Sequence, residues 1–262
     1  MTADSAAGRD IAWEGFANAR DLGGLPARDG RVTRFGAYVR SADLRFVTAA
    51  GWQAAREAGV RTILDLRNDN EIRPGSGQQP TALAGSAQFP APAPAASPPA
   101  WMTRAEVALD DVADTGFWQF IHQERLDGTP LYFRPFLDRK RERCAAVITA
   151  LASAAPGGVI FHCGAGRDRT GLVTLLLLAL AGVEPEAIAR DYEQSAEPLR
   201  ALFAAMGQPD QGPWVEAVLA ERGTTAREAI ISTLDGFDAE AYLLTAGVSP
   251  ASLAAIRHRL LG

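Results

Sequence analysis

The chain has 262 residues, of which 47% are hydrophobic and 22% charged, and its 31 acidic and 26 basic side chains give a formal net charge of -5. This composition excludes an intrinsically disordered chain and argues against a general nucleic-acid or anionic-membrane binder. The length is sufficient for one large domain, and two cysteines are too few for a disulfide framework, which favours a reducing, cytoplasmic compartment.

The first elements indicate an α/β protein. Residues Met1 to Ser5 contain no basic start followed by an apolar run, so we expect no secretory signal. Apolar runs predict buried strands at 37–39 and 60–64, on either side of a helical pattern over 48–58. A helix between two such strands predicts a crossover connection and therefore parallel strands.

Residues 74–100 form a segment rich in proline and alanine. Seven of the 16 prolines lie between Pro74 and Pro99, so this segment cannot be a regular element. Long loops in compact domains are usually functional or disordered. Two interpretations therefore stay open, an active-site lid and a disordered surface insert.

The second half of the chain adds one strand and many helices. We predict a helix over 138–154, a strand over 158–161 and a buried helix within the apolar stretch 172–183, which is shorter than the about 20 residues of a membrane span. After Glu184 the pattern is helical, with expected breaks near Pro198, 207–212, Gly223, Gly236 and Gly247.

These elements predict a mostly parallel central sheet flanked by helices. We expect one domain over 1–262, in which 191–262 form a helical C-terminal lobe.

The segment between the last strand and the apolar helix carries the chemistry, and it reads His162-Cys163-Gly164-Ala165-Gly166-Arg167-Asp168-Arg169-Thr170-Gly171. A glycine-containing loop followed by a helix N-terminus turns N–H groups and a positive dipole end toward one point, which binds a doubly charged oxyanion. The same field favours the thiolate of Cys163, the nucleophilic form of cysteine. Arg169 can hold two phosphate oxygens at once, and Thr170 can donate a hydrogen bond to the sulfur.

This segment resembles the signature of cysteine-dependent protein-tyrosine phosphatases. More narrowly, the chain is similar to the bacterial atypical tyrosine/serine phosphatases of the secreted mycobacterial type, which also act on phosphoinositides. Further motifs that resemble this group are Asn18-Ala19-Arg20-Asp21, Tyr38-Val39-Arg40-Ser41, Asp65-Leu66-Arg67, Asp191-Tyr192 with Ser195, and Tyr242-Leu243 with Gly247-Val248-Ser249.

The resemblance implies a protein-tyrosine-phosphatase-like fold and a covalent phosphocysteine intermediate. It makes Cys163 the nucleophile and Arg169 the phosphate clamp, with no cofactor. The residues that it places around the phosphate are Gly164, Ala165, Gly166, Arg167 and Thr170. The supporting residues are His162, which orders the loop, and a buried ionic frame of Arg20, Asp21, Arg40, Asp65 and Arg67.

The general acid is less clearly defined by the sequence. The resemblance favours Asp168, just before the arginine, although this carboxylate could instead brace the loop. Asp110, Asp111 and Asp114 stay open as alternatives near the expected lid.

Two further residues have open roles. Arg167 could bind a second anionic group of the substrate or could simply be an exposed cation near the thiol. Cys144 could be a resolving thiol for oxidised Cys163 or an inert buried cysteine. No Cys/His/Asp cluster has metal-ligand spacing, so we expect no metal site.

The sequence therefore predicts a phosphomonoester hydrolase that acts on a phosphorylated protein. The alternative substrate is a small phosphorylated metabolite such as a nucleotide, sugar phosphate or inositide. A non-catalytic phosphate-binding module and a sulfur transferase are distant alternatives, since both would normally lack the combined cysteine, arginine and threonine. The oligomeric state stays open.

Overall fold

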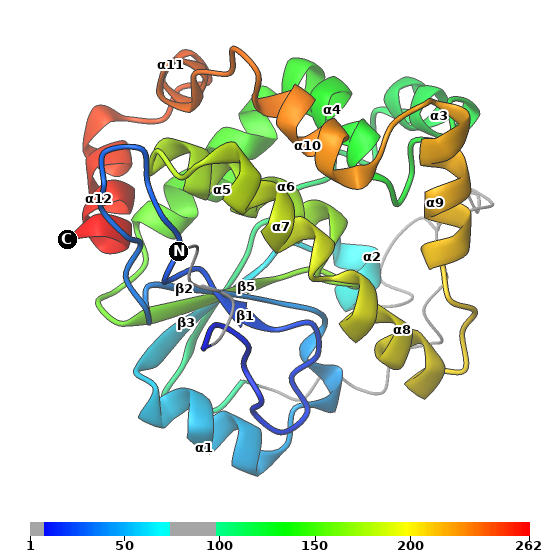
Figure 1. The fold of residues 1–262 in the computed structure, drawn as a ribbon. Helices are drawn as coiled ribbons and strands as arrows, with labels where there is room; N and C mark the ends of the chain where they lie inside the picture. The colour runs from blue at the N-terminus through cyan, green and yellow to red at the C-terminus, as the bar shows by residue number, and fades with distance from the viewer. Residues whose placement is uncertain (1–7, 74–97) are drawn as a thin grey trace.

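A five-stranded sheet lies between helices in the computed structural model, which describes residues 8–73 and 98–262 (Figure 1). The strands follow the order β1 (Arg20–Asp21), β2 (Tyr38–Ser41), β5 (Gly158–His162), β3 (Val60–Asp65) and β4 (Thr103–Glu106). Among the neighbouring strands of this sheet, β1 and β2 pair antiparallel and the other three pairs are parallel. The expected mostly parallel sheet is therefore confirmed, and the three strands predicted from apolar runs form its centre.

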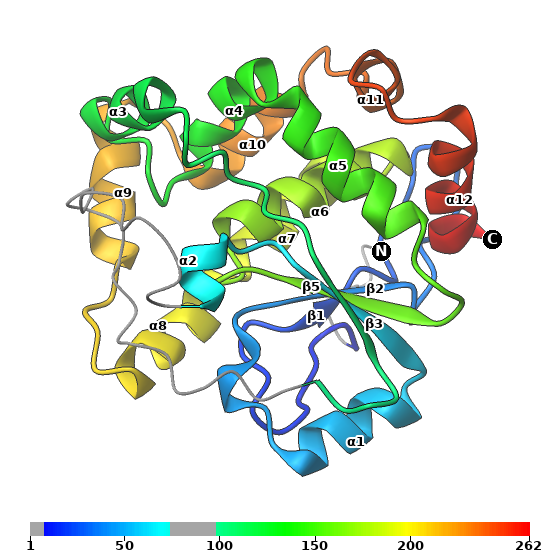
Figure 2. The ribbon, with the colours of Figure 1, turned by 180° about the vertical axis from the view of Figure 1, so that it is seen from behind.

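Alternating side chains of the central strands bury the two faces of the sheet. Val39 and Ile160 belong to the core beneath α1 (Ala49–Glu57), whereas Tyr38 and Phe161 belong to the larger core on the other face. Figures 1 and 2 show α1 alone below the sheet, with α5, α6 and α7 above it. Both faces are covered, as expected for parallel strands that are apolar along their whole length.

The helix predicted over 138–154 is two helices. These are α4 (Phe133–Arg139) and α5 (Arg141–Ala152), and they meet at Lys140, whose φ of -126° and ψ of 35° interrupt the helix. The buried side chain of Lys140 turns back to ion pairs with two aspartates, which holds this break. The apolar stretch forms the buried helix α6 (Asp168–Leu180), which ends before Gly182 at φ 72°.

The chain after Glu184 is helical, as predicted. The break expected near Pro198 is confirmed at 194–195, between two helices, and Pro198 itself lies in the first turn of the second, where its missing N–H needs no partner. The remaining helices are α2 (Asp69–Ile72), α3 (Thr115–Gln123), α7 (Pro185–Glu193), α8 (Ala196–Ala205), α9 (Gly212–Glu221), α10 (Ala226–Leu234), α11 (Ala239–Thr245), α12 (Pro250–Leu261) and the short 3-10 helices η1 (Leu44–Phe46) and η2 (Pro130–Tyr132).

Several sequence-based expectations fall outside these observations. Residues 1–7, and with them the expected absence of a signal, lie outside the described residues, as do residues 74–97 of the proline-rich segment. None of the described helices is both long enough and apolar enough to cross a membrane. The division into one domain with a helical lobe stays a prediction.

Candidate active site

The loop between β5 and α6 turns its carbonyl groups away from its own centre. The Gly164 carbonyl accepts a hydrogen bond from the Asp43 N–H at 2.9 Å, and the Ala165 and Gly166 carbonyls accept from Asn18 Nδ2, each at 3.1 Å. Within the described residues, no acceptor takes a hydrogen bond from the backbone N–H groups of 164–167. Unpaired amides beside a helix N-terminus form a cradle for an oxyanion.

Gly166 brings this loop against the end of β2. Its φ is 69°, and a Cβ atom at this position would lie 2.6 Å from backbone atoms of Ser41 and Ala42. Only glycine fits such a left-handed position in close contact with another backbone segment.

Cys163 lies at the base of the cradle. Its side chain is 2% exposed, and the hydroxyl of Thr170, in the first turn of α6, donates a hydrogen bond to its sulfur at 3.2 Å. A hydroxyl donor stabilises a thiolate both when it attacks and when it leaves. The two residues are therefore arranged for nucleophilic chemistry at sulfur.

Arg169 approaches the cradle with its guanidinium held by Glu71 of α2. Its two Nη atoms donate to the Glu71 carboxylate at 2.6 and 2.8 Å, and Nη1 lies 3.4 Å from Asp110. Burial alone would raise the pKa of Glu71, but the charge and hydrogen bonds of Arg169 outweigh it and lower that pKa. Glu71 also accepts from the Asn68 N–H at 2.9 Å, so the fork has a fixed orientation.

A buried cluster around Asp191 supports the loop from behind. Arg9, Arg20 and Arg40 all pair with the Asp191 carboxylate, and they hold its pKa well below its usual range despite burial. Arg40 Nη2 also donates to the Gly166 carbonyl at 2.8 Å. Three cations against one carboxylate leave excess positive charge behind the cradle, which favours a bound anion.

The residues expected in one ionic frame lie in two clusters instead. Asp65 accepts from Arg67 at 2.7 Å and lies 3.5 Å from His162 Nε2. Burial lowers the pKa of His162, which keeps this ring neutral. Asp21 adjoins the Asp191 cluster through its backbone, since its carbonyl accepts from Arg9 Nε at 3.0 Å, whereas its carboxylate accepts from the N–H groups of two glycines.

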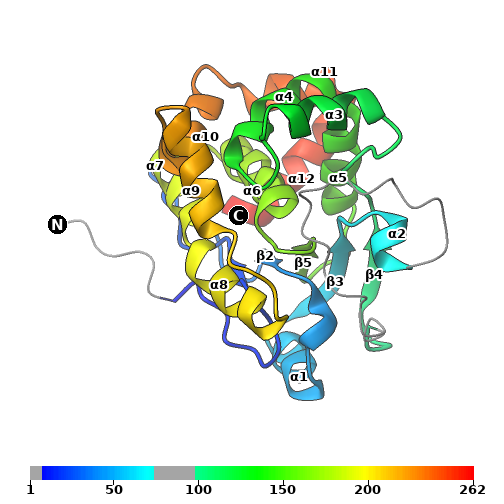
Figure 3. The ribbon, with the colours of Figure 1, turned by 90° about the vertical axis from the view of Figure 1, so that its right-hand side faces the viewer.

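Asp168 and Arg167 are paired with each other. The Asp168 carboxylate accepts from Arg167 Nε at 2.9 Å and from Nη2 at 3.2 Å. The same Nη2 donates to Gln211, at the start of α9, at 3.2 Å. The loop thus lies between α2 on one side and the start of α9 on the other (Figure 3). The Arg167 guanidinium is engaged by neighbouring groups and is only 7% exposed.

The three upstream aspartates differ in their surroundings. Asp111 and Asp114 bind Lys140 at 3.3 and 2.5 Å and face the junction of α4 and α5. Asp110 instead lies beside Arg169, and its Oδ1 atom is buried without a hydrogen-bond partner. Burial raises the pKa of Asp110 to about 6 against the opposing charge of Arg169.

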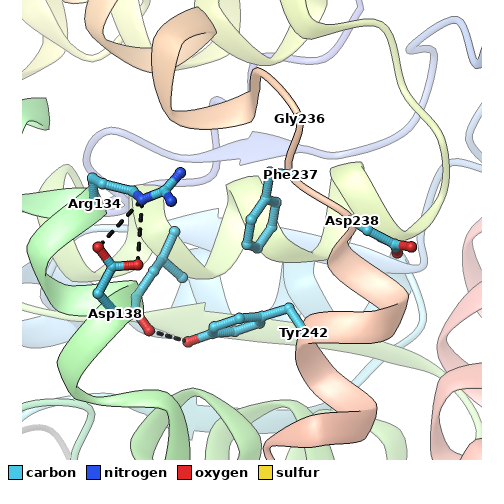
Figure 4. Close-up of a pocket in the computed structure, with 7 residues that line it drawn as sticks. Arg134, Asp138, Gly236, Phe237, Asp238 and Tyr242 are labelled. Carbon is cyan, nitrogen blue, oxygen red and sulfur yellow. Dashed lines mark hydrogen bonds and ion pairs between the residues drawn. The ribbon is translucent and has the colours of Figure 1, made fainter.

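The other sequence candidates lie away from the loop. Cys144 is buried on α5, where burial raises the pKa of its thiol to about 12. Within residues 8–73 and 98–262, no three or more His, Cys, Asp or Glu side chains are grouped to hold a metal ion. A cavity of about 220 Å³ lies between α4 and α11 and contains none of the predicted site residues (Figure 4).

Sequence comparison shows which known proteins the chain is similar to. The tyrosine phosphatase family matches residues 11–262. The chain is 30% identical to the triple specificity protein phosphatase PtpB of Mycobacterium tuberculosis, over 94% of this chain and 96% of that protein. It is 29% identical to the putative tyrosine-protein phosphatase H16_A0669 of Cupriavidus necator, over 86% and 79%, and to a tyrosine-protein phosphatase of Nostoc commune, over 86% and 74%.

Proposed function

The chain belongs to the tyrosine phosphatase family, and from this premise we propose that it removes phosphate from phosphorylated proteins through a phosphocysteine on Cys163. The observation that carries the proposal is the cradle of unpaired amides around Cys163, with the Thr170 hydroxyl on its sulfur. Arg169 completes the site as the clamp for two phosphoryl oxygens. Nothing in this chemistry requires a cofactor.

The reaction proceeds in two displacements. The Cys163 thiolate forms a bond to phosphorus, the bond to the ester oxygen breaks, and a carboxylic acid protonates that oxygen. Water then attacks the phosphocysteine, its proton passes to the carboxylate left by the first step, and the electron pair of the S–P bond returns to sulfur. Thr170 stabilises the departing thiolate, and Glu71 keeps the Arg169 fork in place through both steps.

We assign the proton transfer to Asp110. Both oxygens of Asp168, the residue favoured from the sequence, are engaged by Arg167, which suits a brace for the loop. Asp110 has an unpartnered buried oxygen next to Arg169, and its pKa of about 6 lets it carry a proton near neutral pH. Asp168 is the alternative donor, and a comparison of the two asparagine variants distinguishes them.

The ion pair between Arg167 and Asp168 affects which class of substrate the site favours. A second phosphate of a small metabolite would have to compete with Asp168 for this guanidinium. A single phosphate on a protein side chain makes no such demand, which supports a phosphoprotein substrate over a bisphosphorylated metabolite. The relatives named as protein phosphatases point in the same direction. A reducing compartment such as the cytoplasm suits two cysteines that are both free thiols.

The test is phosphate release from a panel of substrates in the presence of a metal chelator. The panel contains phosphotyrosyl and phosphoseryl peptides, phosphoinositides, sugar phosphates and nucleotides. We expect peptides to lead by about tenfold or more in kcat/KM, which is about 1.4 kcal/mol of transition-state stabilisation. Cys163→Ser should abolish release, whereas Cys144→Ser, far from the loop, is the matched control. A lead by a soluble metabolite would overturn the protein assignment.

A further inference from the structure

Lys140 is a buried cation at the junction of α4 and α5. Its side chain is 6% exposed, and its Nζ atom lies 2.5 Å from the Asp114 carboxylate and 3.3 Å from that of Asp111. The same atom lies 5.1 Å from the centroid of the Phe117 ring. Lysine favours helices and is seldom buried unless it is paired, so its contacts rather than its helix propensity hold the break at this position.

The segment 107–114 is bonded at its start to the end of β3. The Val107 and Leu109 N–H groups donate to the Asp65 and Leu66 carbonyls at 2.9 and 3.1 Å. These two bonds continue the pairing of β4 with β3 beyond the last residue of the strand. The start of the segment is therefore fixed to the sheet.

The end of the same segment is bonded to the helices above the sheet. Asp111 pairs with Arg143 of α5 at 3.2 Å, and both Asp111 and Asp114 pair with Lys140. Asp110 lies between the two fixed ends and is the direct neighbour of Asp111. The backbone that carries Asp110 is therefore held from both sides, with Lys140 as the buried anchor.

The carboxylate of Asp110 depends on this backbone for its direction. Its Oδ2 atom forms a long ion pair, 3.4 Å from Arg169, and its Oδ1 atom is buried without a hydrogen-bond partner. These contacts alone fix a carboxylate weakly. Because a displacement of about 1 Å at a reacting group can cost about 10²-fold in rate, the anchoring of the segment matters for proton transfer.

We infer that Lys140 positions Asp110 for proton transfer to the leaving group by anchoring the segment 107–114. This inference rests on the proposed function, in which Asp110 is the proton donor. Lys140 acts through Asp110 and not on the substrate, so it is a positioning residue. Because both ends of the segment are bonded to the rest of the protein, the proton donor is held in place without the closing movement of a loop.

The test compares two aryl phosphates whose leaving groups differ in their need for a proton. Phenyl phosphate has a poor leaving group that must be protonated, whereas the leaving group of 2,4-dinitrophenyl phosphate departs as an anion. The ratio kcat/KM contains only the steps up to the first displacement, so hydrolysis of the phosphocysteine does not contribute to it. A change in the position of the proton donor should therefore affect kcat/KM for phenyl phosphate alone.

Lys140→Met is the informative variant. Methionine keeps the length of the side chain and can pack against the Phe117 ring, but it removes the charge that holds the two aspartates. We expect kcat/KM to fall by about tenfold or more for phenyl phosphate and to stay within about twofold for 2,4-dinitrophenyl phosphate.

A double substitution tests whether Lys140 acts through Asp110. Asp110→Asn should produce the same difference between the two substrates. In the Asp110→Asn protein, Lys140→Met should change kcat/KM for phenyl phosphate by less than about twofold, because no proton is left to position. If the two losses multiply instead, Lys140 acts independently of Asp110 and the inference is overturned.

Two further variants complete the set. Arg134→Met is the matched control, because Arg134 is a cation of α4 in an exposed ion pair with Asp138 at 3.3 Å (Figure 4). It should leave kcat/KM for both substrates within about twofold of the wild type. Arg143→Met removes the second cation at Asp111, and because this side chain is 42% exposed the variant should fold even if Lys140→Met does not. We expect a smaller loss, about threefold, confined to phenyl phosphate.

The outcomes are separable. An equal loss for both substrates in a folded Lys140→Met protein would assign the lysine to the general integrity of the site and overturn the inference, and so would no loss for either substrate. If Lys140→Met does not fold, the same two results for Arg143→Met overturn it. Failure of the proposed function would look different, because the wild-type protein would then release no phosphate from either ester beyond that released by Cys163→Ser.

Discussion

Replacement of Asp110 by asparagine tests the assignment of the proton donor through its pH dependence. An acid with a pKa of about 6 is protonated below that pH and loses its proton above it. For phosphoseryl peptides, whose leaving group needs a proton, wild-type kcat/KM should therefore fall above about pH 6. Asp110→Asn cannot donate a proton, so this limb should disappear, with a rate loss of about 10²–10⁴ below pH 6.

The same residue has a thermodynamic signature. The difference between a pKa of 3.8 and one of about 6 corresponds to roughly 3 kcal/mol. Because the folded state holds this proton more tightly than the unfolded state, the group's contribution is greatest below about pH 4 and is lost as the pH rises to about 6. Asp110→Asn lacks an ionisable group here, so it should exceed the wild type in stability at pH 7–8, by up to roughly 3 kcal/mol.

Two measurements check this reasoning, pH–rate profiles with a phosphoseryl peptide and urea unfolding between about pH 4 and 8. Asp168→Asn is the matched variant, because it removes the other candidate carboxylate of the same site. If Asp110→Asn keeps the limb near pH 6 and Asp168→Asn loses it, Asp168 is the proton donor. If the difference in unfolding free energy between wild type and Asp110→Asn does not change with pH, the raised pKa of Asp110 is wrong.

Three other substitutions have defined outcomes. Asp191→Ala leaves three buried arginines without their carboxylate and should lower the free energy of unfolding by about 3–5 kcal/mol in urea at neutral pH; a smaller loss than 1 kcal/mol would contradict the cluster. Glu71→Gln keeps the shape but loosens the Arg169 fork, so kcat/KM should fall about tenfold with little change in melting temperature. Thr170→Val removes the donor to Cys163, so hydrolysis of the phosphocysteine should slow and kcat for 4-nitrophenyl phosphate should fall about tenfold. A rapid initial release of 4-nitrophenol should then precede the steady state, and an unchanged kcat would exclude this role.

The central strands and the cysteine loop could be predicted because their signals are local. The apolar runs at β2, β3 and β5 are long enough to read directly, and the loop that follows β5 carries its glycines and its cysteine in one short segment. The strands β1 and β4 could not be predicted, because neither carries a local signal. β1 has two residues, and β4 has two exposed ends, two half-buried residues between them and Ala105 as its one apolar residue, so neither shows a pattern.

Pairing between distant residues could not be predicted. Nothing in the sequence around Glu71 indicates that it holds Arg169, 98 residues later, and Arg9 lies outside every motif that the chain shows. The choice between Asp110 and Asp168 depends on burial and on which cation each carboxylate meets, and both are tertiary properties. In the structure Asn68 and Glu71 form a capping box at the start of α2, and such a pattern in a sequence indicates only where a helix begins.

The cluster around Asp191 also affects when the catalytic centre can fold during synthesis of the chain. Arg9 and Asp191 are 182 residues apart, and Arg20 and Arg40 lie near the same early end of the chain. At 5–20 residues per second, a ribosome needs roughly 10–35 s to reach the carboxylate after it has added the first of these arginines. Until then the three cations have no counter-charge to bury, and the segment that contains them cannot pack against the loop. Assembly of the catalytic centre therefore comes late, after most of the protein has emerged.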